Sequence, residues 1–260
     1  MEVIIYPTKE QANVAAADFV ASAISRNPRI VLGLATGGTP LGLYENLIEK
    51  NKKGEISFAQ ATSFNLDEYY GLPADDKNSY AYYMRENFFD KIDIDLANTY
   101  IPNGMAEDPK IACQEYERKI KAAGGVQLQI LGIGSDGHIG FNEPTSSLSS
   151  RTRMKTLTRE TIEDNARFFD DNPEAVPTHC LTMGIGTIME ADTIVLLAFG
   201  KSKADAVVGM VEGPISSMIP ASILQMHRNV KVFLDEEAAS KLKLADYYKW
   251  VYSRKPSPEW

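Results

Sequence analysis

The sequence predicts an α/β fold with a mostly parallel sheet and helices on both of its faces. Short β-type segments alternate with helical patterns of about 10 to 15 residues, which is typical of successive β-α-β units. Residues 30–34 are apolar throughout, as strands covered on both faces usually are. No internal repeat, low-complexity tract or linker divides the sequence, so we expect a single domain over residues 1–260.

The elements follow from the period of the apolar residues and from helix start and stop signals. Thr8, with a glutamine three residues later, has the spacing of a capping box, and Pro28 ends the helix that follows it. Pro40 suits the first turn of the next helix, and Gly124-Gly125 stop a later one. The expected strands are 3–6, 30–34, 61–64, 100–102, 128–133, 194–199 and 230–234. The other expected helices are 41–50, 79–89, 109–122, 201–211, 220–224 and 235–252.

Residues 145–182 differ from the rest of the chain, since they are polar and lack a long periodic element. A loop-rich segment of this length inside a domain is often functional. We therefore expect a lid or binding flap over about residues 150–182. We expect the C-terminal residues 253–260 to be frayed.

Composition and charge exclude several classes of partner. The formal net charge of -8 argues against a nucleic-acid or anionic-membrane surface, because such surfaces need a basic stripe. No apolar run approaches the ~20 residues that span a bilayer, and the N-terminus lacks the features of a signal peptide. Cys113 and Cys180 have neither metal-ligand nor disulfide-framework spacing. We therefore expect a cytoplasmic protein that binds no nucleic acid and no membrane.

A glycine-rich loop after the apolar strand 128–133 is the main candidate for an active site. It holds Asp136, His138 and Glu143 among several glycines. Its start fits the G-x-G-x-x-G pattern of dinucleotide sites, but no helix is expected to follow, so we reject that interpretation. Metal binding by this group is a weaker alternative, since a second histidine at ligand spacing is absent. Acid–base chemistry is favoured, because neighbouring carboxylates orient an imidazole and tune its pKa.

The loop between the second strand and its helix has the composition of a phosphate cradle. It consists of Thr36, Gly37, Gly38 and Thr39. Glycines let backbone N–H groups point at an anion, and the helix N-terminus adds positive charge. The loop lacks the Gly-Lys-Ser/Thr end of a nucleotide P-loop, which favours a phosphomonoester over ATP.

Cations and a carboxylate elsewhere in the chain complete the candidate site. The possible phosphate ligands are one of the two lysines Lys203 and Lys201, and Arg167 on the expected flap. The alternative interpretation of each is a solvated charge on the surface. Asp67 and Glu68 follow a strand end and point opposite ways on an extended chain, so one of them can face a pocket. Because ligands bind beyond the carboxyl ends of parallel strands, we expect the loops after the strands ending near residues 34, 64, 133 and 199 to converge.

Taken together, these motifs resemble those of glucosamine-6-phosphate deaminases in order and spacing. The resemblance extends from residue 3 to about residue 244 and implies the family's Rossmann-like three-layer sandwich. The matching motifs are T-G-G-T-P (36–40), F-N-L-D-E-Y (64–69), G-I-G-S-D-G-H-I-G-F-N-E-P (132–144), S-R-T-R-M-K-T-L-T (150–158), N-A-R-F-F (165–169) and G-K-S-K-A (200–204).

The resemblance also implies a reaction and a role for each candidate residue. Glucosamine 6-phosphate and water would give fructose 6-phosphate and ammonia, in amino-sugar catabolism, without cofactor or metal. His138, held by Asp136 and Glu143, would move the protons that open the sugar ring. Asp67 would transfer the C2 proton to C1. The phosphate would bind to residues 36–39 and to Arg167 and Lys203. The choice of Lys203 over Lys201 rests on the family match, because no physical argument separates the two lysines.

Some family members have an allosteric site for N-acetylglucosamine 6-phosphate, and its residues match Ser146, Arg153 and Lys155. The competing interpretation is a hinge with solvated cations. In family members that form regulated hexamers, the C-terminal region contributes to that assembly, and here the resemblance weakens in this region. From the resemblance we expect a homo-oligomer, with a hexamer as the first choice and a monomer as the alternative.

Two other functions stay open. A 6-phosphogluconolactonase-like hydrolase would share the phosphate loop and the G-x-G-x-D-G-H string, but it does not need Asp67 as a proton carrier. A non-catalytic sugar-phosphate sensor usually carries a DNA-binding module, for which this chain has no room.

Overall fold

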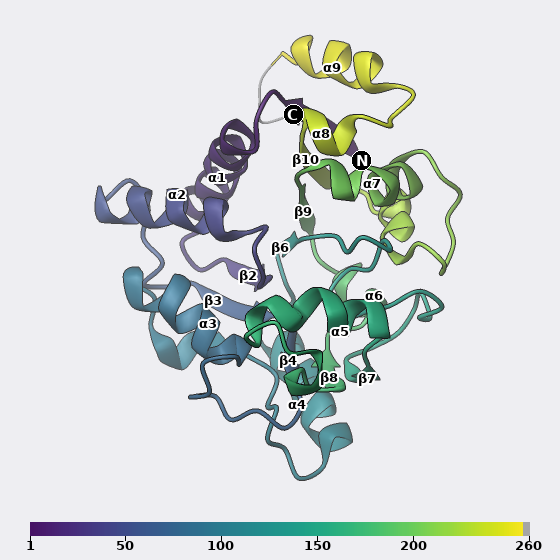
Figure 1. The fold of residues 1–260 in the computed structure, drawn as a ribbon. Helices are drawn as coiled ribbons and strands as arrows, with labels where there is room; N and C mark the ends of the chain where they lie inside the picture. The colour runs from purple at the N-terminus through teal and green to yellow at the C-terminus, as the bar shows by residue number, and fades with distance from the viewer. Residues whose placement is uncertain (257–260) are drawn as a thin grey trace.

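A parallel sheet organises the computed structural model, which describes residues 1–256 (Figure 1). All of its strand pairs are parallel. The α/β class and the parallel sheet are thus as predicted. In spatial order the strands are β1 (Glu2–Tyr6), β10 (Val230–Asp235), β9 (Thr193–Ala198), β6 (Leu128–Leu131), β2 (Val31–Leu34), β3 (Thr62–Asn65) and β5 (Thr99–Tyr100).

The order of the strands reverses between β2 and β6. From β2 the chain continues outward through β3 to β5, and it then returns to the other side of β2 to form β6, β9 and β10. Loops that leave the carboxyl ends of two strands at such a point diverge and open a crevice, where α/β proteins bind ligands. The two loops at this point are the predicted phosphate cradle and the loop that carries His138.

Helices cover both faces of the sheet, which gives the predicted three layers (Figure 1). α1 and α2 lie on one face, and α7 lies on the other. Thr8 caps α1, since its Oγ1 accepts a hydrogen bond from the backbone N–H of Gln11, as the capping-box spacing predicts. The α-helices are α1 (Lys9–Arg26), α2 (Leu41–Lys52), α3 (Tyr80–Asn87), α4 (Pro109–Ala122), α5 (Arg159–Asn165), α6 (Ile185–Ile188), α7 (Ala204–Val211), α8 (Glu236–Ala239) and α9 (Ala245–Ser253). Short 3₁₀ helices lie at Phe89–Lys91, Leu96–Asn98, Ala166–Phe168, Pro173–Ala175, Lys201–Lys203 and Pro220–Met226. Within residues 1–256, the longest helices are too short or too polar to cross a bilayer.

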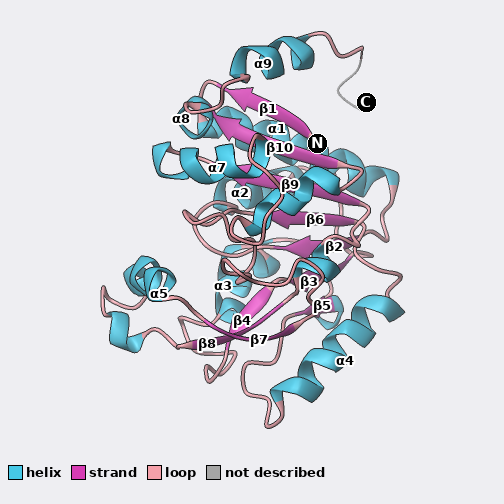
Figure 2. Cartoon of the chain, turned by 90° about the vertical axis from the view of Figure 1, so that its right-hand side faces the viewer, coloured by secondary structure: helices cyan, strands magenta, loops and turns pink. Residues whose placement is uncertain are grey.

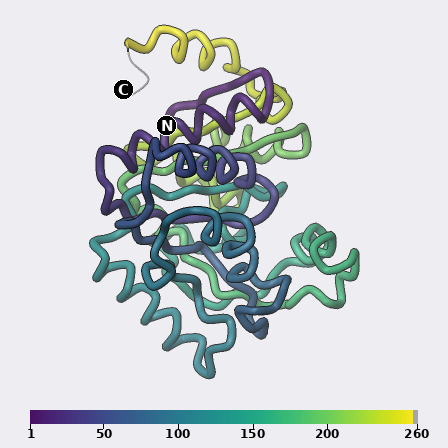
Figure 3. The backbone as a smooth tube through the Cα atoms, turned by 90° about the vertical axis from the view of Figure 1, so that its left-hand side faces the viewer, coloured from purple at the N-terminus to yellow at the C-terminus, as the bar shows by residue number. Residues whose placement is uncertain are grey.

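A second, smaller sheet, which the sequence patterns did not predict, includes two short strands of residues 145–182. β7 (Arg153–Thr156) and β8 (His179–Thr182) pair antiparallel, and β8 also pairs with β4 (Asp67–Tyr69). A separate apolar cluster, which includes Tyr69, Phe141 and Phe169, lies beneath it. Figure 2 shows α5 standing on the side toward which the main strands point, and Figure 3 shows the 150–182 segment, in green, projecting from the body.

The expected C-terminal helix over residues 235–252 is wrong as a single element. The chain forms α8 and α9 with a break between them. The carboxylate of Glu212, at the end of α7, accepts hydrogen bonds from the backbone N–H groups of Lys243 and Leu244, both at 2.9 Å. It therefore fixes a new helix start within the amphipathic run. The expected fraying covered residues 253–260, of which 257–260 lie outside the described part of the chain. Of the others, Ser253 ends α9 and Lys255 pairs with Glu2, so these residues are held against the body and are not frayed.

Candidate active site

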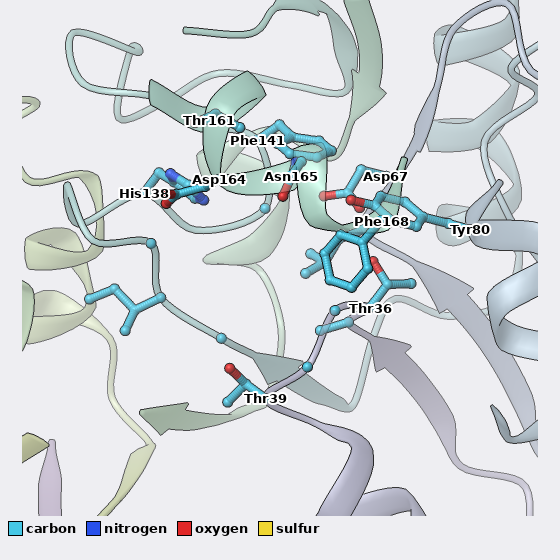
Figure 4. Close-up of a pocket in the computed structure, with 18 of the residues that line it drawn as sticks. Thr36, Thr39, Asp67, Tyr80, His138, Phe141, Thr161, Asp164, Asn165 and Phe168 are labelled. Carbon is cyan, nitrogen blue, oxygen red and sulfur yellow. The ribbon is translucent and has the colours of Figure 1, made fainter. Parts of the chain in front are cut away.

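The loops that follow β2, β3, β6 and β9 line one pocket at the carboxyl edge of the sheet (Figure 4). The convergence predicted from the parallel sheet is thus confirmed. In Figure 4, Asp67 and Tyr80 lie on one side of the pocket and His138 on the other, with Thr39 below. The 150–182 segment closes part of the pocket with Thr161, Asp164, Asn165, Arg167 and Phe168.

His138 lies between two carboxylates. Its Nδ1 is 2.7 Å from Asp136 Oδ1 and 3.4 Å from Glu143 Oε2. Neither contact has regular hydrogen-bond geometry, so attraction between charges dominates both. Asp136 Oδ1 also accepts the backbone N–H of His138 at 3.1 Å, which closes a tight Asx turn. The imidazole therefore presents Nδ1 to the carboxylates and leaves Nε2 for the pocket.

Gly134 makes room for this imidazole. A Cβ added at Gly134 would lie 2.3 Å from the ring of His138, which is too close for any side chain. The backbone N–H of Gly134 donates to the carbonyl of His138 at 2.9 Å, so the loop folds back on itself. The loop has the glycine spacing of a dinucleotide site but no helix follows it, so the rejection of that interpretation is confirmed.

The charges in this cluster displace two pKa values in opposite directions. Burial lowers the pKa of His138, but Asp136 and Glu143 outweigh burial and raise it to about 9. Burial raises the pKa of Asp136, but His138 outweighs burial and holds it well below its usual range. Near neutral pH the free protein therefore holds an imidazolium beside an ionised Asp136.

Asp67 faces the pocket from β4 and is 5% exposed. A Cβ added at Gly140 would lie 3.4 Å from Asp67 Oδ2, so this carboxylate is directed at the loop that carries His138. Burial and the charge of Glu68 raise the pKa of Asp67 to about 7, although His138 opposes them. The sequence predicted that one of the two adjacent acids would face the pocket; that acid is Asp67.

The predicted phosphate cradle is open toward the pocket. Cβ atoms added at Gly37 or Gly38 would meet nothing within 4 Å, so these glycines leave the backbone accessible. Gly37 has a φ of +89°, which favours glycine, and its carbonyl accepts the Tyr83 hydroxyl at 2.7 Å. Thr39 lies at the same wall, and a Cβ at Gly132 would approach it to 3.9 Å.

Two cations line the same pocket as this cradle. Arg167 and Lys203 both line the pocket, whereas the competing candidate Lys201 is not among its lining residues. Burial lowers the pKa of Lys203, Asp164 opposes this, and the nearby Arg167 lowers it further. Two cations that repel each other next to exposed backbone N–H groups form a favourable site for a dianion.

Asp136, His138 and Glu143 form a group of residues that could hold a metal ion in this pocket. Its ligand atoms lie within 4.8 Å of one another. Two donors bound to one Zn²⁺ ion at ~2.0–2.1 Å stand about 3.3 Å apart in tetrahedral geometry. The 2.7 Å between Nδ1 and Asp136 Oδ1 is shorter than this separation and places the two groups in direct contact. The arrangement fits acid–base chemistry better than metal binding.

Of the residues matched to an allosteric site, Arg153 is engaged inside the protein through its side chain. Nη1 of Arg153 donates to Asn142 Oδ1 at 2.8 Å, and Asn142 in turn donates to the carbonyls of Ile139 and Met183. Ser146 is 3% exposed and its backbone N–H donates to the carbonyl of Glu143. Arg153 and Lys155 alternate with exposed residues along β7, so they share one face of that strand.

Comparison with known proteins places the chain in a family. A family model described as glucosamine-6-phosphate isomerases/6-phosphogluconolactonase matches residues 8–233. The chain belongs to this family. It is 53% identical to a glucosamine-6-phosphate deaminase of Mycolicibacterium smegmatis over 99% of this chain and 98% of that protein. It is 55% identical to one of Hahella chejuensis over 97% and 96% of the two chains.

Solved structures agree with the family assignment. A structure described as a monomeric glucosamine-6-phosphate deaminase matches with a TM-score of 0.90 and 47% identity, over 92% of this chain and 99% of that one. A 6-phosphogluconolactonase from Leishmania guyanensis matches with a TM-score of 0.73 and 23% identity, over 93% and 98% of the two chains. The second likeness shows the common fold alone.

Several pocket residues of this family member were missed by the sequence patterns. They are Tyr80 on α3 and Thr161, Asp164, Asn165 and Phe168 on the 150–182 segment. Only Phe168 and Asn165 carried a signal, because they flank Arg167 in the N-A-R-F-F motif. The others reach the pocket through tertiary packing, which has no local pattern.

Proposed function

We propose that the protein converts glucosamine 6-phosphate and water to fructose 6-phosphate and ammonia. The observation that carries this proposal is one pocket that combines the Asp67 carboxylate, the His138 cluster and a cationic phosphate cradle. Identity above 50% to curated deaminases along almost the entire chain supports the same activity. The chemistry is an aldose–ketose isomerisation coupled to loss of the amino group.

His138 and Asp67 divide the proton transfers of this reaction. His138, oriented by Asp136 and Glu143, donates and accepts the protons that open the pyranose ring. Asp67 removes the proton from C2 of the open chain and delivers it to C1, which a single carboxylate can do on one face of adjacent carbons. Water then hydrolyses the imine at C2 and releases ammonia. Side chains and water perform every step of this scheme, and positioned acid–base groups typically give ~10² to 10⁴ in rate each.

The phosphate group anchors the substrate at the other end of the pocket. Thr36, Gly37, Gly38 and Thr39 supply hydroxyl and N–H donors, and Arg167 and Lys203 supply charge. Because the phosphate is remote from C1 and C2, its binding energy orients the reacting carbons. The 150–182 segment, which carries Arg167, acts as a lid within a single domain.

One assay separates the candidate functions. Purified protein is incubated with glucosamine 6-phosphate, and both ammonia and fructose 6-phosphate are measured, with hydrolysis of gluconolactone 6-phosphate as the control reaction. Equal amounts of the two products support the proposal. Lactone hydrolysis without ammonia would favour the 6-phosphogluconolactonase alternative, and binding of the sugar phosphate without either reaction would favour a sensor.

Assembly, regulation and location are further parts of the proposal. A hexamer stays our first prediction, and the monomer gains support from the solved relative described as monomeric; light scattering after size exclusion decides between them. Activation by N-acetylglucosamine 6-phosphate through Ser146, Arg153 and Lys155 is tested by initial-rate curves with and without that ligand. We expect the enzyme to work in the cytoplasm.

A further inference from the structure

Glu68 is buried next to Asp67 and has no role in the scheme above. It is 2% exposed, and it is directed away from the pocket, into the packing between β4 and α3. A Cβ added at Gly104 would lie 3.2 Å from Glu68 Cγ, so the loop after β5 also packs against this side chain. A buried carboxylate that touches no substrate needs another reason to be there.

The carboxylate of Glu68 joins two elements that line the active site. Its Oε1 accepts the backbone N–H groups of Tyr69 at 2.8 Å and Tyr80 at 2.9 Å, and its Oε2 accepts that of Ala81 at 2.8 Å. Tyr80 and Ala81 open helix α3, while Tyr69 follows Asp67 on β4. The side chain therefore fixes β4 against the helix whose first residue lines the pocket.

The same three bonds favour the ionised form of Glu68. A protonated carboxyl group would have to direct its O–H into a site where backbone N–H groups already point at both oxygens. Burial acts in the opposite direction and, together with the charge of Asp76, outweighs these donors and raises the pKa of Glu68 to about 7, so Glu68 is partly ionised near neutral pH. The fixed donors and the adjacent helix N-terminus favour a negative charge at this position.

Few other charges act on Asp67. The titratable groups within its electrostatic reach come from β4 itself, the loop after β6, α3, α4 and β8; they are Glu68, Tyr69, His138, Tyr80, Tyr116 and Cys180. Burial raises the pKa values of the three tyrosines and of the Cys180 thiol, so these groups are neutral at physiological pH. Among the described residues, the ionised form of Glu68 and the imidazolium of His138 are then the charges that act on Asp67.

We propose that Glu68 is a positioning residue for Asp67, which it serves by fixing β4 against Tyr80 and by placing a second negative charge beside that carboxylate. This inference rests on the proposed function, because it assigns Glu68 to the C2-to-C1 proton transfer. A carboxylate that both accepts and returns a proton works best when its pKa is near the working pH. An ordinary aspartate would be too weak a base to remove the C2 proton efficiently.

The first test compares the pH profiles of three variants. Glu68→Gln removes the charge and keeps the length, Glu68→Asp keeps the charge and shortens the side chain, and Glu45→Gln changes an exposed acid on α2 as a control. In Glu68→Gln we expect the acid limb of kcat/KM to move to lower pH by on the order of one unit. We expect kcat at the optimum to fall while KM changes less than about twofold, since Glu68 does not touch substrate. Glu68→Asp and Glu45→Gln should keep the wild-type limb.

A purely structural role gives a different result. Both Glu68 variants would then lower thermal stability or kcat while the acid limb stays in place, and the charge part of the proposal would be overturned. A rise in KM without a change in kcat would also overturn it, because Glu68 would then act on binding.

A second measurement does not depend on activity and titrates the wild-type protein. Carboxyl ¹³C NMR of the wild-type protein follows the Cγ of Asp67, assigned with Asp67→Asn, and the Cδ of Glu68. We expect Asp67 to titrate above the ordinary carboxyl range, with an inflection shared with Glu68. Independent single-step curves would overturn the proposal. If the wild-type protein releases no ammonia from glucosamine 6-phosphate, the proposed function fails, whereas this titration still decides whether the two carboxylates are coupled.

Discussion

Replacing Asp67 by asparagine should make the folded protein more stable above neutral pH while it removes most of the activity. Burial and the charge of Glu68 raise the pKa of Asp67 from 3.8 to about 7, although His138 opposes them. Between these pH values the folded protein holds a proton that the unfolded chain has released. The free energy of unfolding therefore falls as the pH rises through this window, and the full cost is present above about pH 7. Asparagine never ionises and avoids this cost.

The size of the effect follows from the pKa shift. Three pH units correspond to at most about 4 kcal/mol, because one unit is worth about 1.36 kcal/mol. We expect roughly half of this, ~2 kcal/mol, since the buried amide of asparagine has its own unsatisfied hydrogen-bonding groups. For a protein of this size, ~2 kcal/mol raises Tm by about 4 to 8 °C.

Thermal unfolding at pH 5 and at pH 8.5, followed by circular dichroism, measures this difference. The Tm of Asp67→Asn should be clearly higher than that of the wild type at pH 8.5 and only slightly higher at pH 5. Asp75→Asn changes an exposed acid as a control, and its Tm should match that of the wild type at both pH values. The same Asp67→Asn protein should lose ~10² to 10⁴ in kcat with little change in KM. A stability difference that is equal at both pH values would refute the assigned ionisation, and near-normal turnover would refute the catalytic role.

Three further predictions concern other parts of the site. Asp136→Asn should lower the pKa of His138, so the basic limb of kcat/KM moves to lower pH, and an unchanged pH profile would contradict the pairing seen in the structure. Gly134→Ala should cost at least ~10-fold in kcat/KM, because the new Cβ would displace the His138 ring; a fully active variant would show that this ring position is not required. Lys203→Ala should raise KM for the sugar phosphate by about 10-fold or more, while Lys201→Ala should leave it unchanged, and the reverse pattern would exchange their roles.

The parallel sheet and the convergence of its loops could be predicted from sequence because their signals are local. Helix α4 agrees with the expected 109–122 segment at both ends: Asp108 caps it, Pro109 occupies its first turn, and Gly124 and Gly125 adopt positive φ after it. The carboxyl ends of parallel strands share one edge, so the position of each strand also placed each candidate loop.

The small antiparallel sheet could not be predicted, because its signals are not local. β7 and β8 have four residues each, and β8 obtains its second partner, β4, from more than a hundred residues earlier in the chain. The break between α8 and α9 has the same cause, since it depends on the carboxylate of Glu212 on another helix. Contacts between distant segments decided both features, and the apolar period of each segment carries no information about them.

The two aspartates of the pocket show how environment divides the chemistry. Asp67 and Asp136 have the same side chain, yet burial and a neighbouring anion raise the pKa of one, while the imidazolium of His138 lowers that of the other. A group that carries a proton between two carbons must exist in both protonation states near neutral pH, which agrees with the role proposed for Asp67. A group that orients an imidazole must keep its charge throughout the cycle, which agrees with the role proposed for Asp136. The sequence identifies both as acids at strand ends; their different roles follow from the burial of β4 and from the tight turn that holds His138 against Asp136.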